Sequence, residues 1–393
     1  MQVVKEEDIV SQYISAMKRE INPSDEYVKT TKYILNKINL MTATPEDIIN
    51  FLNRLRKVES NDPLHKWIGT YNLNVVILKR FFKWFNNPYC MNGIKLLKRK
   101  EKSVYKPSDL WTQEDDLLFL KYCPSKRDKC YHAISRDSSC RPSEILKLRI
   151  KDITFKMING KQYAEVLING KTGSRHIPLI NSIPYLKDYL DDHPSKGNPN
   201  SILIRSSRTF GKLSHRSLGA IYMRYKTRYF PKLLRIEDIN SLDRKAIEEL
   251  LQKPWNPYVR RHSALTEKSK FLKEHILRQH AGWSTGSGMP QKYLHYFGNE
   301  SSESILEVYG LKPKAEVIDK MKPKQCPNCS EPNKPDSRFC SKCRMILSYD
   351  AYTETVEQNE KQSDKITRME ERQEKFELII QSLIDSGQLK PTD

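Results

Sequence analysis

The stretch Ala281–Tyr296, AGWSTGSGMPQKYLHY, decides how the rest of the chain is interpreted. It carries Trp283 and Tyr293, and a basic segment leads into it. A tyrosine in a basic chain can stack on nucleic acid or hydrogen-bond to it. It can also attack a phosphodiester, but only where other residues hold the phosphate and neutralise its charge. The remainder of the sequence must therefore supply those residues if Tyr293 is a nucleophile.

The charge of the chain favours a polyanionic partner. The 393 residues carry a formal net charge of +20 and give a pI of about 9.4. Residues 351–393 hold six basic against ten acidic side chains, so the excess lies entirely in residues 1–350. Nucleic acid is the partner that such a surface fits best, although a merely basic soluble protein has the same composition.

The chain has no hallmark of secretion or membrane insertion. Its first residues, MQVVKEEDIV, lack the basic-then-apolar pattern of a signal peptide, and no apolar run reaches the roughly 18–20 residues of a membrane span. Of eight cysteines, four stand alone and four form two CxxC units, which suits a reducing compartment. We expect a cytoplasmic, DNA-associated protein with no membrane partner.

Residues 1–104 read as a helical module. Apolar residues recur at helical spacing in Ile9–Ile21, Asp25–Ile38 and Asn72–Phe85, and Thr44-Pro45-Glu46-Asp47 begins another helix with a capping residue, proline and acids in order. The basic side chains of the last helix form a face that can lie along a DNA backbone or simply be solvated. The charged, proline-containing segment 98–108 ends this module.

Two later stretches offer charges that could hold a phosphate. Arg141 stands directly before a helix that starts at Pro142, where the free N–H groups of the helix start also attract anions. Asn159-Gly160 and Asn169-Gly170 lie between β-prone runs and predict a three-stranded antiparallel meander, with Lys171 at the second hairpin tip. Each residue alone could be an ordinary exposed cation.

Helices resume after the meander, at Pro184–Asp191, Leu218–Tyr229 and Ile236–Leu251. The segment PYVRRHSALTEKSKFL at residues 257–272 then brings Arg261 into another helix just ahead of the opening stretch. The order of these features, Arg, hairpin Lys, Arg-His-Ser, Gly-Trp and Tyr, resembles the tyrosine recombinase (phage-integrase) family over residues 5–312. The segment YLHYFGNESSESILEVYGL is similar to archaeal integrases.

The resemblance assigns roles to individual residues. Arg141 matches the first arginine of the family, Lys171 its hairpin lysine, Arg261 its second arginine, and Trp283 a His-or-Trp position. Tyr293 falls at the nucleophile, which would form a 3′-phosphotyrosyl ester with DNA, without metal or ATP. Two arginine forks can neutralise the phosphate, and a lysine can protonate the leaving 5′ oxygen. Glu144 matches an acidic position that would orient Arg141.

Two departures from the family pattern bear on activity. Tyr258 stands where the family usually has His, and a phenol with a pKa of about 10 is a poor base, although it can donate a hydrogen bond to the phosphate. Trp283 and Tyr293 are one residue further apart than is common, in a Gly- and Ser-rich segment. We therefore expect a mobile tether that docks Tyr293 at the phosphate only when DNA and a neighbouring protomer are in place. We prefer Tyr293 to Tyr296 as nucleophile.

The C-terminal region predicts a metal site and a helix. Two CxxC units ten residues apart are typical of a zinc ribbon with a closed, structural Cys₄ site. Beyond it, apolar residues at three- and four-residue steps predict a helix that either self-associates or packs on its own protein. The proposed zinc ligands are Cys326, Cys329, Cys340 and Cys343. The stripe of the helix at these steps, called the seam below, consists of Ile366, Met369, Gln373, Phe376, Ile380 and Leu383.

The sequence thus predicts a mostly helical α+β protein with four parts. They are a helical DNA clamp (1–104), a tyrosine recombinase catalytic domain with a small antiparallel sheet (105–320), a zinc ribbon (321–348) and a helical tail (352–388). The function expected is site-specific DNA recombination or integration by dimers or tetramers on double-stranded DNA, with structural zinc and no catalytic cofactor. The alternatives are an integrase-like DNA-binding regulator or accessory protein without catalysis, and a type IB topoisomerase, which the GKTG hairpin and the archaeal-like segment disfavour.

Overall fold

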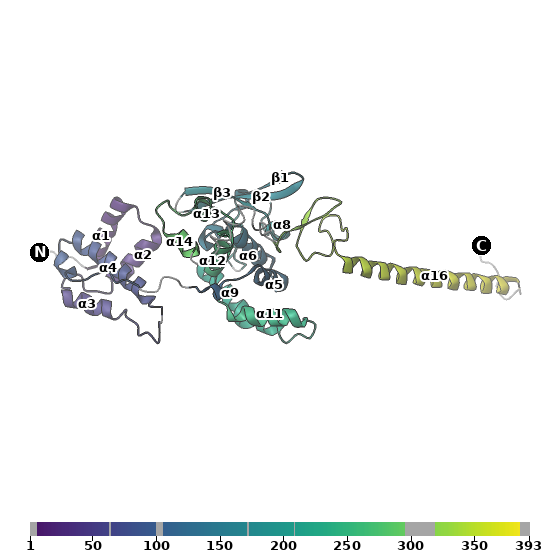
Figure 1. Cartoon of the computed structure of the whole chain (residues 1–393), viewed down its shortest axis with the longest axis horizontal. Helices are drawn as coiled ribbons and strands as arrows, with labels where there is room; N and C mark the ends of the chain where they lie inside the picture. Colours follow the sequence, from purple (N-terminus) through teal and green to yellow (C-terminus); the bar gives the residue numbers. More distant parts are fainter. Residues whose placement is uncertain are drawn as a thin grey trace, which may run out of the picture. The chain divides into compact units, whose positions relative to one another are not determined.

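The computed structural model describes residues 6–62, 64–99, 105–170, 173–207, 209–294 and 319–385. Its contacts divide the chain into two compact units, Met1–Val104 and Tyr105–Asp393. Both are mainly helical, and a small antiparallel sheet is present, as the sequence predicts (Figure 1). The described strands β4 and β5 form a second, two-stranded sheet. Within the described ranges no helix combines the length and apolar character needed to cross a bilayer.

The first unit is a helical bundle with its own core. Helix α4 supplies much of that core, because Phe81 and Phe82 are fully buried and stack edge-to-face at 5.3 Å. Helix α3 begins as predicted, since Thr44 caps it and Asp47 completes the capping box. The elements are α1 (Glu6–Ile21), α2 (Asp25–Leu35), α3 (Pro45–Asn53), α4 (Trp67–Trp84) and the 3₁₀ turn η1 (Pro88–Met91).

The second unit begins with helices that surround a three-stranded sheet. The order β1-β2-β3 is the predicted meander, and the turn at Asn159-Gly160 has positive φ at both residues. In chain order, the elements from the start of this unit to the helix that follows the sheet are η2 (Pro107–Asp109), α5 (Gln113–Tyr122), α6 (Lys126–Ser138), α7 (Pro142–Ile145), η3 (Ile150–Asp152), β1 (Ile153–Ile158), β2 (Lys161–Gly170), β3 (Gly173–Leu179) and α8 (Ile183–Asp191).

Two sequence expectations are corrected in this region. Asn169-Gly170 is not the second hairpin turn, because β2 continues through Gly170, which pairs with Gly173. The two strands therefore join across Lys171 and Thr172, and both residues lie outside the described part of the chain. The helix expected from Ile236 begins later, at Ser241, because Asn240 accepts a hydrogen bond from Asp243 and caps it there.

The remaining elements complete the second unit and lead to the C-terminus. The main core gathers apolar side chains from α5, α6, the sheet and α8 to α12, and a smaller cluster joins Trp283 and Tyr293. The last helix is one continuous 37-residue element (Figure 1). The elements are α9 (His215–Arg224), the π-turn η4 (Tyr225–Tyr229), α10 (Phe230–Leu233), α11 (Ser241–Gln252), α12 (Pro257–Lys268), α13 (Glu274–Ala281), α14 (Met289–Leu294), β4 (Lys324–Gln325), β5 (Pro332–Asn333) and α16 (Tyr349–Asp385).

Candidate functional site

The C-terminal end of α13 is the point on which the predicted arginines converge. The last carbonyls of a helix have no partner within the helix and carry partial negative charge. Gly282 ends α13 in the left-handed conformation, with φ of 64°, and exposes these carbonyls. Arg261 donates from Nη2 to the oxygen of Ala281 at 2.8 Å, and Arg141 from Nη2 to that of Gly282 at 3.2 Å. The helix end thus brings together two arginines that lie far apart in the sequence.

Arg261 is held almost entirely inside the unit. It lies on α12, is 5% exposed, and also donates from Nη1 to the carbonyl oxygen of Ser139 at 2.6 Å. Carbonyl oxygens carry no net charge, so they fix the guanidinium without neutralising it. Burial and the nearby charge of Arg141 lower the pKa of Arg261 to about 10. The group is therefore a desolvated cation that gains from a bound anion.

Arg141 is oriented by Glu144, as the sequence predicts. The backbone N–H of Arg141 donates to Glu144 Oε2 at 2.8 Å, and its Nη1 donates to Oε1 at 3.1 Å, so the pair closes the start of α7. Burial alone would raise the pKa of Glu144, but hydrogen bonds from Arg175 and from the Arg141 backbone, together with both guanidinium charges, lower that pKa overall. Glu144 is therefore an anion between two arginines.

Arg175 is a site residue that the sequence motifs do not reveal. Its Nε donates to the carbonyl oxygen of His280 at 3.1 Å, and its Nη2 donates to Glu144 Oε2 at 3.0 Å. A side-chain carbon at Gly282 would lie 2.7 Å from Arg175 Nη1, and one at Gly170 would lie 2.5 Å from Glu144 Oε1. A signal is nevertheless present in β3, where Arg175 shares the inward face with buried Ile177 and Leu179.

Tyr293 is docked on the same unit beside this cluster. It is 2% exposed, and its hydroxyl oxygen lies 2.8 Å from His262 Nδ1. The ring stacks on Trp283 with centroids 5.4 Å apart and a tilt of 23°. Tyr293 also interacts electrostatically with Arg261, favouring the charged guanidinium. Trp283 and His262 thus pack on the Tyr293 ring from two sides, and the expectation that Tyr293 docks at the phosphate only with DNA and a neighbouring protomer stays a prediction.

The other residues considered from the sequence are Tyr258, Lys171 and Tyr296. Tyr258 stands one helical turn before Arg261 on α12, but it is 42% exposed and its ring lies 5.4 Å from that of His215. Lys171 and Tyr296 lie outside the described residues. His262 follows Arg261 in the Arg-His-Ser motif, and only its three-dimensional pairing with Tyr293 indicates a role for it.

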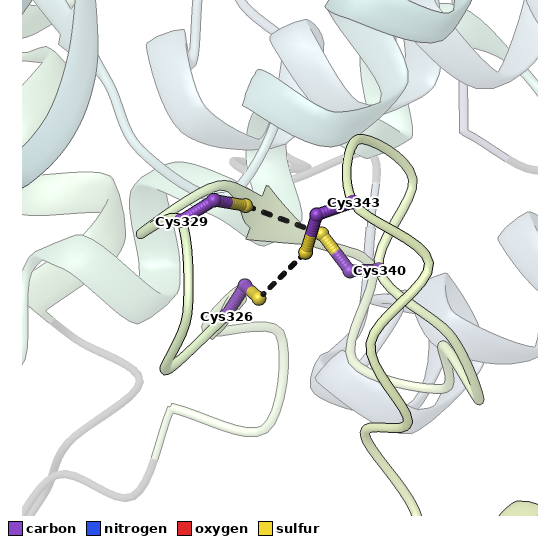
Figure 2. A group of neighbouring side chains, drawn as sticks. All are labelled: Cys326, Cys329, Cys340 and Cys343. Carbon is purple, nitrogen blue, oxygen red and sulfur yellow. Dashed lines mark hydrogen bonds between the residues drawn. The ribbon is translucent and has the colours of Figure 1, made fainter.

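The four C-terminal cysteines form a candidate metal centre. All four sulfur atoms lie within 4.8 Å of one another (Figure 2). Cys326 and Cys343 are 3.5 Å apart at Sγ, and Cys329 and Cys340 are 3.6 Å apart, too far for disulfides of about 2.05 Å. Zinc–sulfur bonds of about 2.3 Å at tetrahedral angles place sulfurs about 3.8 Å apart, so the donor set fits structural zinc.

This cysteine cluster belongs to a segment that contacts α8. Lys334 Nζ donates to Asp188 Oδ2 at 2.6 Å, and Lys187 pairs with Glu331. Asp188 also forms an ion pair with Lys126 at 2.9 Å. These partly exposed pairs add little stability singly, but together they fix one face of the segment.

Helix α16 exposes most of the predicted seam. Ala351 is buried at its start, whereas Ile366, Met369 and Phe376 are more than half exposed. Ile380 is 37% exposed, and the side chain of Leu383 lies outside the described ones. The structure of one chain thus leaves the seam accessible to another molecule.

No protein-family model and no curated protein matches the chain. Among solved structures it is similar to a XerA recombinase, with 16% identity and a TM-score of 0.37 over 79% of this chain and 100% of that one. It is similar to a lambda integrase (75–356) dimer bound to a COC′ core site, with 13% identity and a TM-score of 0.49 over 75% and 96% of the two chains. For the Tn1549 transposon integrase with transposon right-end DNA, the identity is 14% and the TM-score 0.48 over 77% and 99%.

These neighbours are tyrosine recombinases and integrases, the class that the sequence motifs resemble. Their TM-scores lie below 0.5, and their identities are too low to carry residue roles across.

Proposed function

We propose that this chain is a site-specific DNA recombinase or integrase that cleaves and rejoins strands through a 3′-phosphotyrosyl intermediate. Tyr293 is the nucleophile, and Arg141 and Arg261 hold the phosphate and neutralise the charge that develops on it. Lys171 protonates the leaving 5′ oxygen, and Tyr258 donates a hydrogen bond to the phosphate. Trp283 forms the wall of the pocket on which the tyrosine ring packs.

One observation carries the proposal. Arg141 and Arg175 share the carboxylate of Glu144, and Arg261 donates to a backbone carbonyl at the same helix end. Tyr293 is buried in one apolar cluster with Ala281 and Trp283. Such an arrangement leaves positive charge in a desolvated place, where its attraction for an anion is strongest. A phosphodiester is an anion that both fits two guanidinium forks and reacts with a tyrosine.

The other parts of the chain fit this activity. The first unit serves as a clamp on double-stranded DNA, since the net charge of the chain is +20. The cysteine cluster holds one structural zinc, measurable by metal analysis of the purified protein as about one ion per chain. Helix α16 joins two or more copies on DNA, so deleting residues 354–393 lowers the sedimentation coefficient of the assembly. The protein works in the cytoplasm, on DNA.

Covalent trapping tests the activity even when the target sequence has not been identified. The protein is incubated with a pool of random duplexes, each nicked so that cleavage releases a short strand that diffuses away. Detergent-resistant adducts are then captured and their DNA sequenced. We expect adducts with wild type and Tyr296→Phe, none with Tyr293→Phe, and a common sequence in the trapped strands.

Two results would overturn parts of this proposal. Adducts from Tyr293→Phe but not from Tyr296→Phe would move the nucleophile to Tyr296. Absence of adducts from wild type that still binds DNA in gel shifts would favour the alternative, a DNA-binding regulator without catalysis.

Chelation of zinc should not stop cleavage by residues 105–320 alone, because the proposed chemistry uses no metal.

A further inference from the structure

His262 and Arg261 are neighbours on α12 that face different parts of the pocket. Successive residues of an α-helix point about 100° apart. Arg261 therefore reaches the carbonyls of Ser139 and Ala281, while His262 reaches Tyr293 on α14. The Nδ1 atom of His262 lies 2.8 Å from the Tyr293 hydroxyl oxygen, and the two rings stack with centroids 5.6 Å apart.

The remaining contacts hold this pair in place. Tyr105 packs on His262 from another element, with centroids 5.0 Å apart, and Trp283 packs on Tyr293. The Tyr293 ring is thus held between an imidazole and an indole, with its hydroxyl directed at the imidazole nitrogen. With the imidazole proton on Nε2, Nδ1 is an acceptor and the tyrosine hydroxyl is the donor.

The proposed reaction requires such an acceptor. A tyrosine hydroxyl with a pKa of about 10 must lose its proton as it attacks phosphorus, and imidazole, with a pKa of about 6.5, can take it near neutral pH. Tyr258 cannot, because it is itself a phenol and lies against His215. Nδ1 of His262 is already within the roughly 2.6–3.2 Å that a general base needs.

We propose that His262 is a catalytic residue, the general base that accepts the Tyr293 proton during strand cleavage and returns it during rejoining. This rests on the proposed function. In cleavage the Tyr293 oxygen–phosphorus bond forms and the bond from phosphorus to the 5′ oxygen breaks. The Tyr293 proton moves to His262 Nδ1, and the 5′ oxygen takes a proton from Lys171. No oxidant, metal or further reactant is needed.

Charged and titratable groups around His262 and Tyr293 both favour and oppose the proton transfer between them. They include Arg261, which attracts the developing tyrosinate and repels the imidazolium, and Tyr105, whose ring covers His262. A phosphate bound to the arginines offsets the repulsion, because its negative charge stabilises the imidazolium. The base is therefore most effective once DNA is in place.

His262→Asn separates proton transfer from hydrogen bonding. The asparagine amide oxygen can still accept a hydrogen bond from Tyr293, but it cannot take a proton. We expect strand cleavage, measured as adduct formation on a trapped target, to slow by about 10²- to 10³-fold. DNA affinity in gel shifts should stay within about twofold. His65→Asn, a matched substitution in the first unit at a residue with φ of 45°, should cleave like wild type.

The pH profile distinguishes a base from a positioning residue. Wild-type cleavage should rise with pH and level off near the pKa of an imidazole, about 6.5, whereas His262→Asn should keep rising toward that of a phenol, about 10. Fluorinated tyrosine at position 293, which is more acidic, should restore cleavage by His262→Asn by a larger factor than it changes wild type. Cleavage by His262→Asn at the wild-type rate and with the wild-type profile would overturn the proposal.

The proposal remains testable if His262→Asn fails to fold. In wild type with fluorotyrosine at position 293, an inflection that stays near the imidazole pKa supports His262. An inflection that moves with the phenol contradicts it. If wild type makes no Tyr293-dependent adduct, the proposed function itself fails. If it does and His262→Asn is unimpaired, only the role of His262 fails.

Discussion

Arg260 and Arg261 are adjacent on α12 and have opposite surroundings. Arg260 is fully buried, pairs with Asp116 and lies over the Trp111 ring at 4.9 Å. Asp116 also accepts a hydrogen bond from His132 at 2.8 Å and forms an ion pair with Arg136, which in turn pairs with Glu267. Two guanidinium groups thus meet two carboxylates, and the charge of this cluster is balanced inside the fold.

The Arg261 side of the helix is not balanced. Arg141 and Arg175 both pair with the carboxylate of Glu144, and Arg261 donates to the backbone carbonyls of Ser139 and Ala281. Burying a charge without a counter-charge costs free energy, which an anion from outside can recover. Burial alone therefore does not distinguish a structural arginine from a functional one. The sign and number of the charged groups around the arginine distinguish them.

Replacing Arg261 should have the largest effect. Arg261→Gln keeps an amide that can donate to one of the carbonyls but removes the charge that holds the phosphate. We expect strand cleavage to fall by about 10³-fold or more, since a single donor to a developing oxyanion is worth about 10² to 10³. Adduct formation on a trapped target measures the rate, and urea unfolding measures stability.

The unfolding free energy of Arg261→Gln should differ from that of wild type by less than about 2 kcal/mol, because removing the charge also removes its repulsion by Arg141. A loss of stability as large as that of the Arg260 variant, with cleavage intact, would show that Arg261 is a structural residue like its neighbour.

Arg260→Met should act on stability instead. It leaves Asp116 buried with one arginine fewer, and breaking a buried pair costs about 3 kcal/mol or more. Adding Asp116→Asn removes the unpaired charge while keeping an acceptor for His132. The double variant should therefore be about 2 kcal/mol more stable than the sum of the two single changes predicts, as urea unfolding of all four proteins will measure. Strict additivity would show that Arg260 and Asp116 do not form a pair.

The sequence could predict the members of the site whose neighbours are local. Arg141 with Glu144 lies within one turn of a helix, and the four cysteines lie within two short loops. The contacts that give Arg261 its environment come from Ser139, 122 residues away, and from a helix end. Arg175 and His262 acquire their partners only when strand, helix and segment meet. The alternation in β3 places Arg175 on the inward face but does not identify those partners. The same limit explains why the packing of Tyr293 between Trp283 and His262 could not be predicted.

The smallest effect should be a loss of folding stability at acidic pH that comes from His132, a member of the charge-balanced cluster around Asp116. His132 lies fully buried between Asp116 and Tyr222, whose hydroxyl is 3.0 Å from Nδ1. Burial, and next the charge of Arg260, lower the pKa of His132 to about 4, although Asp116 acts in the opposite sense. In the unfolded chain its pKa is about 6.5. His132 is thus neutral in the folded protein at pH 7.

Because the folded pKa is the lower one, the unfolded chain takes up a proton first as the pH falls. Both states are neutral at pH 7 and above, so no stability is lost there. Between about pH 6.5 and pH 4 only the unfolded chain is protonated. The fold loses about 3 kcal/mol in all, a loss that is complete below the folded pKa, and about 2 kcal/mol of it is lost by about pH 4.5. His132→Asn cannot titrate, so its unfolding free energy should depend less on pH by about that amount when both proteins are unfolded in urea at about pH 7 and about pH 4.5. Groups that do not contact His132 titrate equally in both proteins and cancel in the difference. Parallel pH dependences would mean that His132 is not held neutral, and the charge balance assigned to this side of α12 would then be wrong.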